Sequence, residues 1–172
     1  MDNEQNPELM NAPNSDVLKY QLDCLKIEIS QIESVIGRLE TYSQNARNFS
    51  TALWVGGITI MAGQDSLQPY IFLISIIPLL FWFIDARWVR FTKGPIIRSR
   101  EISKFINGPH LQASISSGRL EDFTVLDVMG KQYRGTEEYR KRTNLWHILG
   151  YRTLYLHYGT MVALSILISL VI

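Results

Sequence analysis

The C-terminal stretch YRTLYLHYGTMVALSILISLVI (residues 151–172) decides the class of this chain. After Arg152 it contains no Asp, Glu, Lys or Arg. A helix of about 20 apolar residues is long enough to cross the hydrocarbon core of a bilayer, about 30 Å thick. We therefore predict that residues 151–172 form an apolar membrane helix.

Two shorter apolar runs precede this stretch, at residues 49–63 and 69–84. Only the segment QDSLQ separates them, and Asp65 in that segment is their one charge. The pattern predicts a membrane hairpin over residues 46–86. A buried hairpin in a soluble protein would have the same pattern, and we keep it as the alternative.

Basic residues follow the second run directly and predict the orientation. Cytoplasmic loops are enriched in Lys and Arg, whereas the QDSLQ turn has neither. We therefore place the N-terminus inside, the turn outside and the C-terminus outside, with three crossings. The alternatives for these bases are contacts with anionic lipid head groups or with RNA. The basic inner face consists of Arg87, Arg90, Lys93, Arg98 and Arg100.

The N-terminal part is acidic, with eight acids and four bases in residues 1–48. We expect residues 1–14 to be disordered and residues 15–45 to form an amphipathic helix capped by Asn14 or Ser15. Its apolar residues alternate at spacings of three and four, which is the seam of a coiled coil and predicts self-association. An amphipathic helix that packs within its own chain has the same pattern. The seam residues are Leu18, Leu22, Leu25, Ile29, Ile32, Ile36 and Leu39.

Residues 87–150 are predicted to be a basic, helical cytoplasmic region. Gly94 and Pro95 indicate a break or kink in the helix that leaves the membrane. Thr136 is a suitable N-cap, and no strong helix breaker follows it apart from Gly150 and Gly159. Residues 136–172 are therefore expected to form one helix of 37 residues.

Arginine precedes histidine by five residues at two places, Arg142 with His147 and Arg152 with His157. This spacing is the signature of HEPN ribonucleases, in which the histidine acts as a general acid or base and the arginine binds phosphate. Five residues turn a helix by about 500°, so the two side chains diverge unless the helix starts between them. We therefore favour Arg152 and His157 as interior contacts with a role in assembly or gating. The alternatives are an Arg152 that snorkels to the interface with an interfacial His157, and RNA cleavage.

We expect no cofactor and no metal. The sequence has no Cys or His cluster for zinc and no Gly-rich phosphate loop. Its one cysteine, Cys24, is expected to be an idle thiol, and His110 is expected at the surface.

The short hairpin, the basic segment and the motif YRTLYLH together resemble the small accessory membrane proteins of type VI-B CRISPR loci. Those proteins work beside an RNA-guided RNA nuclease. The resemblance implies an oligomeric pore in the bacterial inner membrane that enhances antiviral defence by depolarisation, and it implies that Arg152 and His157 are important.

We therefore expect an all-α integral membrane protein that forms a non-enzymatic homo-oligomeric pore. The alternatives are a membrane-anchored HEPN-type ribonuclease that uses Arg152 and His157, and a non-conducting anchor for the nuclease.

Overall fold

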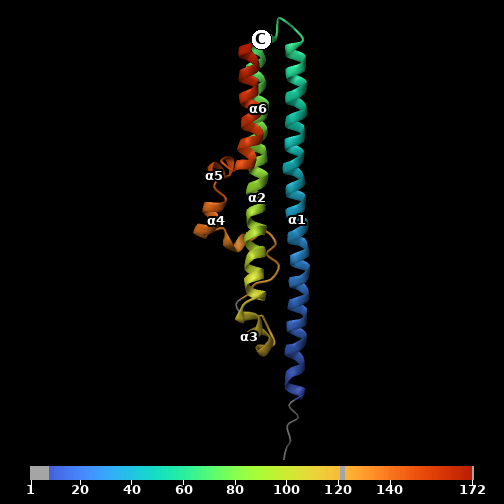
Figure 1. Cartoon of the computed structure of the whole chain (residues 1–172). Coiled ribbons are helices and arrows are strands. Elements are labelled where there is room, and N and C mark those ends of the chain that lie inside the picture. The colour runs from blue at the N-terminus through green and yellow to red at the C-terminus, as the bar shows by residue number, and fades with distance from the viewer. Residues whose placement is uncertain (1–7, 121–122, 172) are drawn as a thin grey trace, which may run out of the picture. The chain divides into compact units, whose positions relative to one another are not determined.

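A computed structural model describes residues 8–120 and 123–171, with side chains from residue 16 onward. Every regular element in these ranges is a helix, which confirms the all-α prediction for the described chain. The elements are α1 (Glu8–Ala62), the 3₁₀ helix η1 (Gln68–Ser75), α2 (Ile76–Ile106), α3 (Pro109–Ser117), the 3₁₀ helix η2 (Lys131–Tyr133), α4 (Glu137–Arg142), α5 (Leu145–Leu149) and α6 (Arg152–Val171) (Figure 1).

The chain divides into two compact units, which we describe separately. Unit 1 comprises Met1–Val35 and Gly94–Arg134, and unit 2 comprises Ile36–Lys93 and Gly135–Ile172. The helices α1 and α2 each contribute one part to each unit.

Unit 2 holds the apolar helices. Within it α6 lies along η1 and the first half of α2, and it ends beside the turn that joins α1 to η1 (Figure 1). Its core consists of side chains that are at most 6% exposed, and the rings of Trp54, Phe81 and Trp82 pack against them. These core residues are Ala86, Ile148, Leu154, Tyr158 and Met161.

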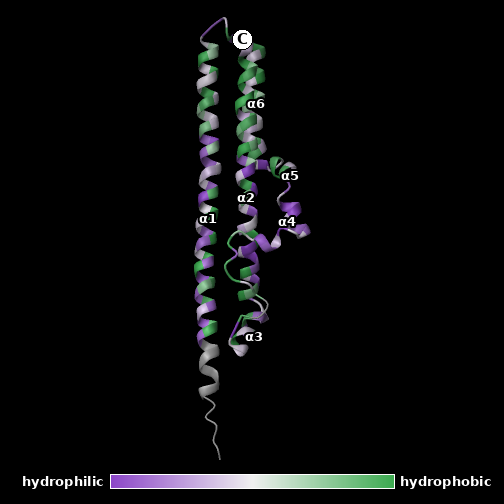
Figure 2. Cartoon of the chain, turned by 180° about the vertical axis from the view of Figure 1, so that it is seen from behind, coloured by the Kyte–Doolittle hydropathy of each residue, from purple (hydrophilic) through white to green (hydrophobic). Residues whose placement is uncertain are grey.

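Two helices are long and apolar enough to cross a membrane, the continuous segment Gln68–Ile106 and the helix Arg152–Val171. The chain itself buries only 22% of each apolar stretch, whereas the core helix of a soluble protein is mostly buried. Hydrophobic residues cover the upper parts of α1, α2 and α6 in Figure 2. The first apolar run forms the end of α1 and is not one of the two candidates, so its crossing stays a prediction.

The single helix expected over residues 136–172 is wrong, because two local caps interrupt it. Thr136 caps α4 as predicted, accepting a hydrogen bond from the Tyr139 backbone N–H at 3.2 Å. Asn144 then accepts from the Trp146 backbone N–H at 3.0 Å and starts α5. Asn side chains compete with helical hydrogen bonds in this way. Gly150 ends α5, and α6 begins at Arg152.

Of the break or kink expected at Gly94 and Pro95, the break is wrong, because α2 continues through both residues to Ile106, and the kink stays a prediction. In unit 1 the loop after α3 passes directly over Gly94. A Cβ on Gly130 would lie 2.6 Å from the Gly94 carbonyl oxygen, and Gly130 has a left-handed φ of 59°. Glycine is therefore required at Gly130 both by the close approach and by the backbone.

The α1 helix begins at Glu8, so the caps expected at Asn14 and Ser15 are wrong. The expected disorder of residues 1–14 stays a prediction, and residues 1–7 lie outside the described part of the chain.

The seam residues of α1 pack against other parts of the same chain, as expected for an amphipathic helix that packs within its own chain. In unit 1 Leu25 and Ile32 are only 3% and 2% exposed. Ile29 and Ile32 line one apolar hollow together with Ile102 of α2. Leu22 and Ile36 are half-buried. This seam is therefore not open for pairing along its whole length with a second copy.

Candidate functional site

The candidate site is a group of polar side chains buried between the three long helices of unit 2. Ser43 and Arg47 come from α1, Asp85 comes from α2, and His157 and Tyr158 come from α6. The site lies where the apolar part of each helix ends. Residues 48–62, 66–84 and 153–171 contain no Asp, Glu, Lys or Arg, and the adjoining charged residues are Arg47, Asp85 and Arg152.

Asp85 is the centre of this network and is completely buried. Its Oδ2 accepts hydrogen bonds from Arg47 Nε at 2.8 Å and from the Tyr158 hydroxyl at 3.2 Å. Its Oδ1 accepts a short hydrogen bond from the Ser43 hydroxyl. Arg47 Nη2 also donates to the Ser43 hydroxyl oxygen at 3.2 Å, which closes the ring of contacts. One carboxylate therefore joins all three helices.

The partners of Asp85 explain how unit 2 tolerates a buried charge. Removing a carboxylate from water costs several kcal/mol unless a cation and hydrogen-bond donors replace the water. Arg47 supplies that cation, and its own side chain is 25% exposed, so the pair keeps one polar edge. Burying ionisable groups between apolar helices costs free energy, and in membrane proteins such groups lie either at helix contacts or at functional sites.

The depth of the network follows from helix geometry. Arg47 lies 16 residues before Gly63 and His157 lies 14 residues before Val171, which correspond to about 24 Å and 21 Å along a helix. A hydrocarbon core is about 30 Å thick. The network therefore lies closer to the α1–η1 end of the apolar helices than the thickness of a hydrocarbon core.

His157 is only partly satisfied. Its ring meets the Tyr158 ring edge-on at 4.8 Å, interacts with the Arg47 backbone through a hydrogen bond and is within electrostatic reach of Arg47 and Asp85. Its Nε2 is buried and has no hydrogen-bond partner among the described residues. The same holds for the hydroxyl of Ser50, which lies one turn from Arg47 and is completely buried. Buried polar groups almost always have hydrogen-bond partners, so two buried polar atoms without partners in one small helix bundle indicate a candidate site.

Further polar bonds hold the three helices together. The Trp54 indole donates to the Ser165 hydroxyl at 2.8 Å, linking α1 to α6. The Trp82 indole donates to the Leu149 carbonyl at 3.1 Å and stacks on Tyr158 with 6.3 Å between centroids. Small and polar residues at helix contacts are typical of helix packing in membranes.

The structure does not bring the first predicted pair together. Arg152 is exposed at the first residue of α6 and has no ion-pair or hydrogen-bond partner within residues 8–120 and 123–171. His157, five residues later, is half-buried beside Tyr158. The divergence of about 140° expected from the helix therefore separates the two side chains.

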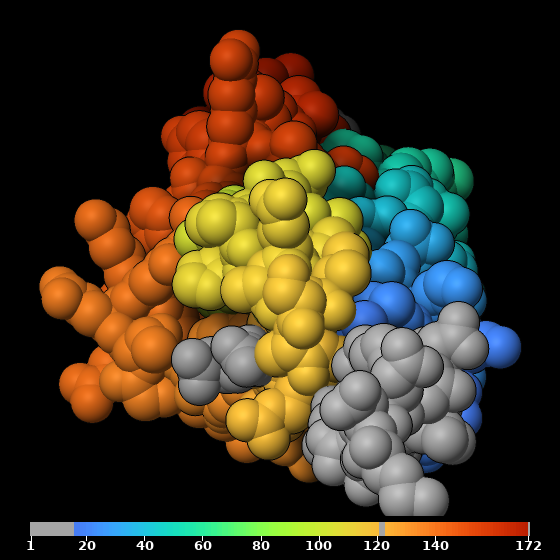
Figure 3. All heavy atoms as spheres, turned by 90° about the horizontal axis from the view of Figure 1, so that it is seen from below, coloured from blue at the N-terminus to red at the C-terminus, as the bar shows by residue number. Residues whose placement is uncertain are grey.

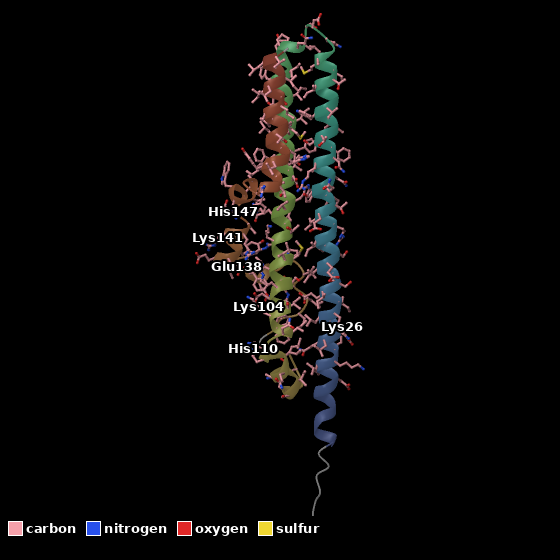
Figure 4. The ribbon with its side chains drawn as sticks, viewed as in Figure 1. Lys26, Lys104, His110, Glu138, Lys141 and His147 are labelled. Atoms are coloured by element: carbon pink, nitrogen blue, oxygen red, sulfur yellow. The ribbon has the colours of Figure 1, made fainter. Side chains whose placement is uncertain are left out.

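The second pair has a different geometry. The α5 helix starts between Arg142 and His147, and both side chains line one surface hollow of about 490 Å³. Arg142 is paired with Glu138 at 2.9 Å, and His147 packs edge-on against Tyr151. Figure 3 shows side chains of the α4 region, in orange, extending from the surface, and Figure 4 shows Glu138, Lys141 and His147 on this arm.

The predicted basic inner face is only partly a surface. Arg87, Arg90 and Arg100 are exposed, and Lys93 is half-buried over the Tyr151 ring at 4.8 Å. The placement of Arg98 on this face is wrong, because in unit 1 Arg98 is 1% exposed and forms an ion pair with Glu28 at 2.6 Å.

The Glu28–Arg98 pair organises unit 1. Glu28 also accepts hydrogen bonds from the backbone N–H groups of Leu126 and Asp127, at 2.7 and 3.1 Å. Arg98 donates to the Tyr133 hydroxyl at 3.2 Å and, at short distance, to the Thr124 carbonyl. The pair therefore fastens the loop after α3 onto α1 and α2.

Sequence analysis missed both buried ion pairs. Each had a signal: Asp85 directly follows the apolar run of residues 69–84, and Glu28 adjoins the seam residue Ile29. An acid that is buried beside an apolar face requires a basic partner. Comparisons with protein-family models, with curated proteins and with solved structures gave no match.

Proposed function

We propose that the protein is an integral membrane protein that assembles into a homo-oligomeric pore and permeabilises the bacterial inner membrane. The observation that carries the proposal is the inversion of polarity in unit 2. Its charged pair, Arg47 with Asp85, lies between the helices, whereas many large apolar side chains are exposed on its outer surface, among them Phe49, Leu80 and Leu167. Lipid or other copies of the chain are the surroundings in which such a surface is stable.

Permeation requires more than one chain, because the three helices of unit 2 pack their side chains against one another around a buried network. The proposal therefore needs an assembly in which several copies of unit 2 surround the path. The buried Nε2 of His157 and the hydroxyl of Ser50 support this, since polar groups at membrane depth face a partner, a bundle interior or water. We assign these two groups to the water path that opens in the assembly.

The trigger follows from the resemblance of YRTLYLH to the accessory proteins of type VI-B CRISPR loci. In this proposal the pore opens when an RNA-guided RNA nuclease has recognised its target. Arg152 and His157 then do not act as one pair in the pore, because Arg152 is exposed whereas His157 is half-buried.

The test has two stages. First, membranes from cells that express the protein are washed with alkaline carbonate, and an integral protein stays in the pellet. Second, a voltage-sensitive dye reports the membrane potential with and without the active nuclease and its target. We expect depolarisation only with the activated nuclease, and loss of it in His157→Ala. A potential that does not change under any condition overturns the pore and leaves a non-conducting anchor.

A second candidate function is metal-independent RNA cleavage by Arg142 and His147, because they share one hollow and a helix starts between them. The sequence-based version of this alternative used Arg152 and His157, which the structure separates. Purified protein incubated with labelled RNA and a chelator tests it. Cleavage that disappears in His147→Ala but persists in His157→Ala supports this candidate, whereas intact RNA excludes it.

A further inference from the structure

The outer surface of unit 2 carries an apolar groove where α2, α5 and α6 meet. Its volume is about 450 Å³, and nearly all of its lining is apolar or aromatic. Several of its side chains are strongly exposed, above all Trp146 at 82% and Tyr155 at 58%. The groove is lined by Leu79, Trp82, Phe83, Trp146, Leu149, Gly150 and Tyr155.

Two cations adjoin the residues that line this groove. Arg152 follows the lining residue Gly150 by two positions and is exposed at the start of α6. Lys93 lies over the ring of Tyr151, the residue between them, with 4.8 Å from Nζ to the ring centroid. Neither cation pairs with a carboxylate in the part of the chain that the structure describes. Tyr151 also lines the neighbouring hollow, together with Glu137, Glu138, Lys141 and Arg142, and there Glu138 is paired with Arg142.

An apolar groove beside two cations that have no carboxylate partner in the described part of the chain is complementary to an amphiphile with a negative head. Arg152 also lies at the boundary of the charge-free part of α6, the level at which lipid phosphates meet a membrane helix. Aromatic rings such as Trp146 and Tyr155 are typical of this level. We propose that the groove holds an acyl chain of one anionic phospholipid and that Arg152 and Lys93 bind its phosphate.

The proposal rests on the membrane insertion in the proposed function, but not on pore formation. It gives a specific role to Arg152, which begins α6, is exposed and has no ion-pair partner in the described part of the chain. A second copy of the chain would need to supply an acid to Arg152 and Lys93, and that alternative is an outcome of the test.

The experiment uses the full chain in a neutral detergent and native mass spectrometry. Phosphatidylglycerol and phosphatidylcholine with identical acyl chains are titrated separately, and the lipid retained per chain is measured. We expect one phosphatidylglycerol per chain at concentrations where phosphatidylcholine is not retained. Each basic residue near a membrane surface contributes about fivefold in affinity, so Arg152→Gln is expected to reduce that preference about fivefold.

Two further variants make the result specific. Arg119→Gln removes an exposed arginine from unit 1 and is expected to keep the full preference. Trp146→Ala is expected to weaken retention of both lipids alike, and its fold is not at risk because the side chain is 82% exposed. Added inorganic phosphate at millimolar concentration is expected not to displace the lipid.

Equal retention of the two lipids by the native protein overturns the proposal, and so does an unchanged preference in Arg152→Gln. Dimers that exclude lipid from the groove overturn it in favour of a second copy. Failure of membrane insertion is recognised separately, because the protein is then removed from membranes by carbonate.

Discussion

Arg47 Nε and Asp85 Oδ2 lie 2.8 Å apart, although 38 residues separate them in the chain. Each residue is the first charge beyond the apolar part of its helix. The ion pair therefore fixes the register of α1 against α2 at one level, and Tyr158 adds α6 to the same carboxylate. A slip of either helix by one turn would leave a buried charge without its partner.

The first prediction concerns the contribution of the Asp85 carboxylate to the free energy of unfolding. Asp85→Ala leaves Arg47 unpaired between apolar helices, and breaking a buried pair costs about 3–5 kcal/mol. Asp85→Asn keeps an acceptor for Arg47 and Ser43 and is expected to cost less. Thermal unfolding of the purified protein in detergent measures both. Asp65→Ala, in the exposed turn, is the control, and equal unfolding temperatures for Asp85→Ala and Asp65→Ala would contradict the assignment.

The second prediction concerns Glu28 and Arg98 in unit 1. Each single substitution to leucine leaves a buried charge alone, so we expect a loss of about 3–5 kcal/mol from either. The double substitution removes both charges and is expected to recover a large part of that loss, with a coupling energy well above that of independent sites.

Limited proteolysis gives this cycle a local readout. Glu28 holds the backbone of Leu126 and Asp127, so cleavage between residues 123 and 133 is expected to accelerate in both single variants. Additive losses in the cycle, with no change in cleavage, would show that the pair does not fasten the loop.

The third prediction separates packing within the chain from pairing between chains along α1. Ile32 is 2% exposed and Ile27 is 54% exposed, and both lie on α1 in unit 1. Ile32→Asp buries an unpaired charge in the core of unit 1 and is expected to unfold it. Ile27→Asp is expected to leave the fold and its unfolding temperature unchanged. A folded Ile32→Asp protein of smaller assembled size would restore the coiled-coil interpretation.

The helical class and the apolar segments could be predicted from the sequence, because the spacing of apolar residues and the length of apolar runs are local properties of the chain. The heptad pattern of α1 predicted the face that is buried but not its partner, since an internal neighbour and a second copy require the same spacing. Asn144 was missed as a cap because no local pattern in the sequence shows that one helix ends before it and that α5 starts after it. The partners of Asp85 lie at distances of 38 to 73 residues, beyond any local pattern.

The last prediction concerns His157, whose buried Nε2 has no partner in the described chain. An unsatisfied buried polar group costs free energy, so His157→Phe, with a ring in the same place, is expected to stabilise unit 2 by about 1 kcal/mol. Tyr158→Phe loses the bond to Asp85 and is expected to destabilise it by a similar amount. The same His157→Phe protein is expected to lose permeation, because the polar group assigned to the water path is gone. Unfolding temperatures of the purified variants measure the first effect, and depolarisation of cells that contain the activated nuclease measures the second. A less stable His157→Phe protein would show that the imidazole is a packing or hydrogen-bonding element, and a stabilised variant with normal depolarisation would remove His157 from the pore.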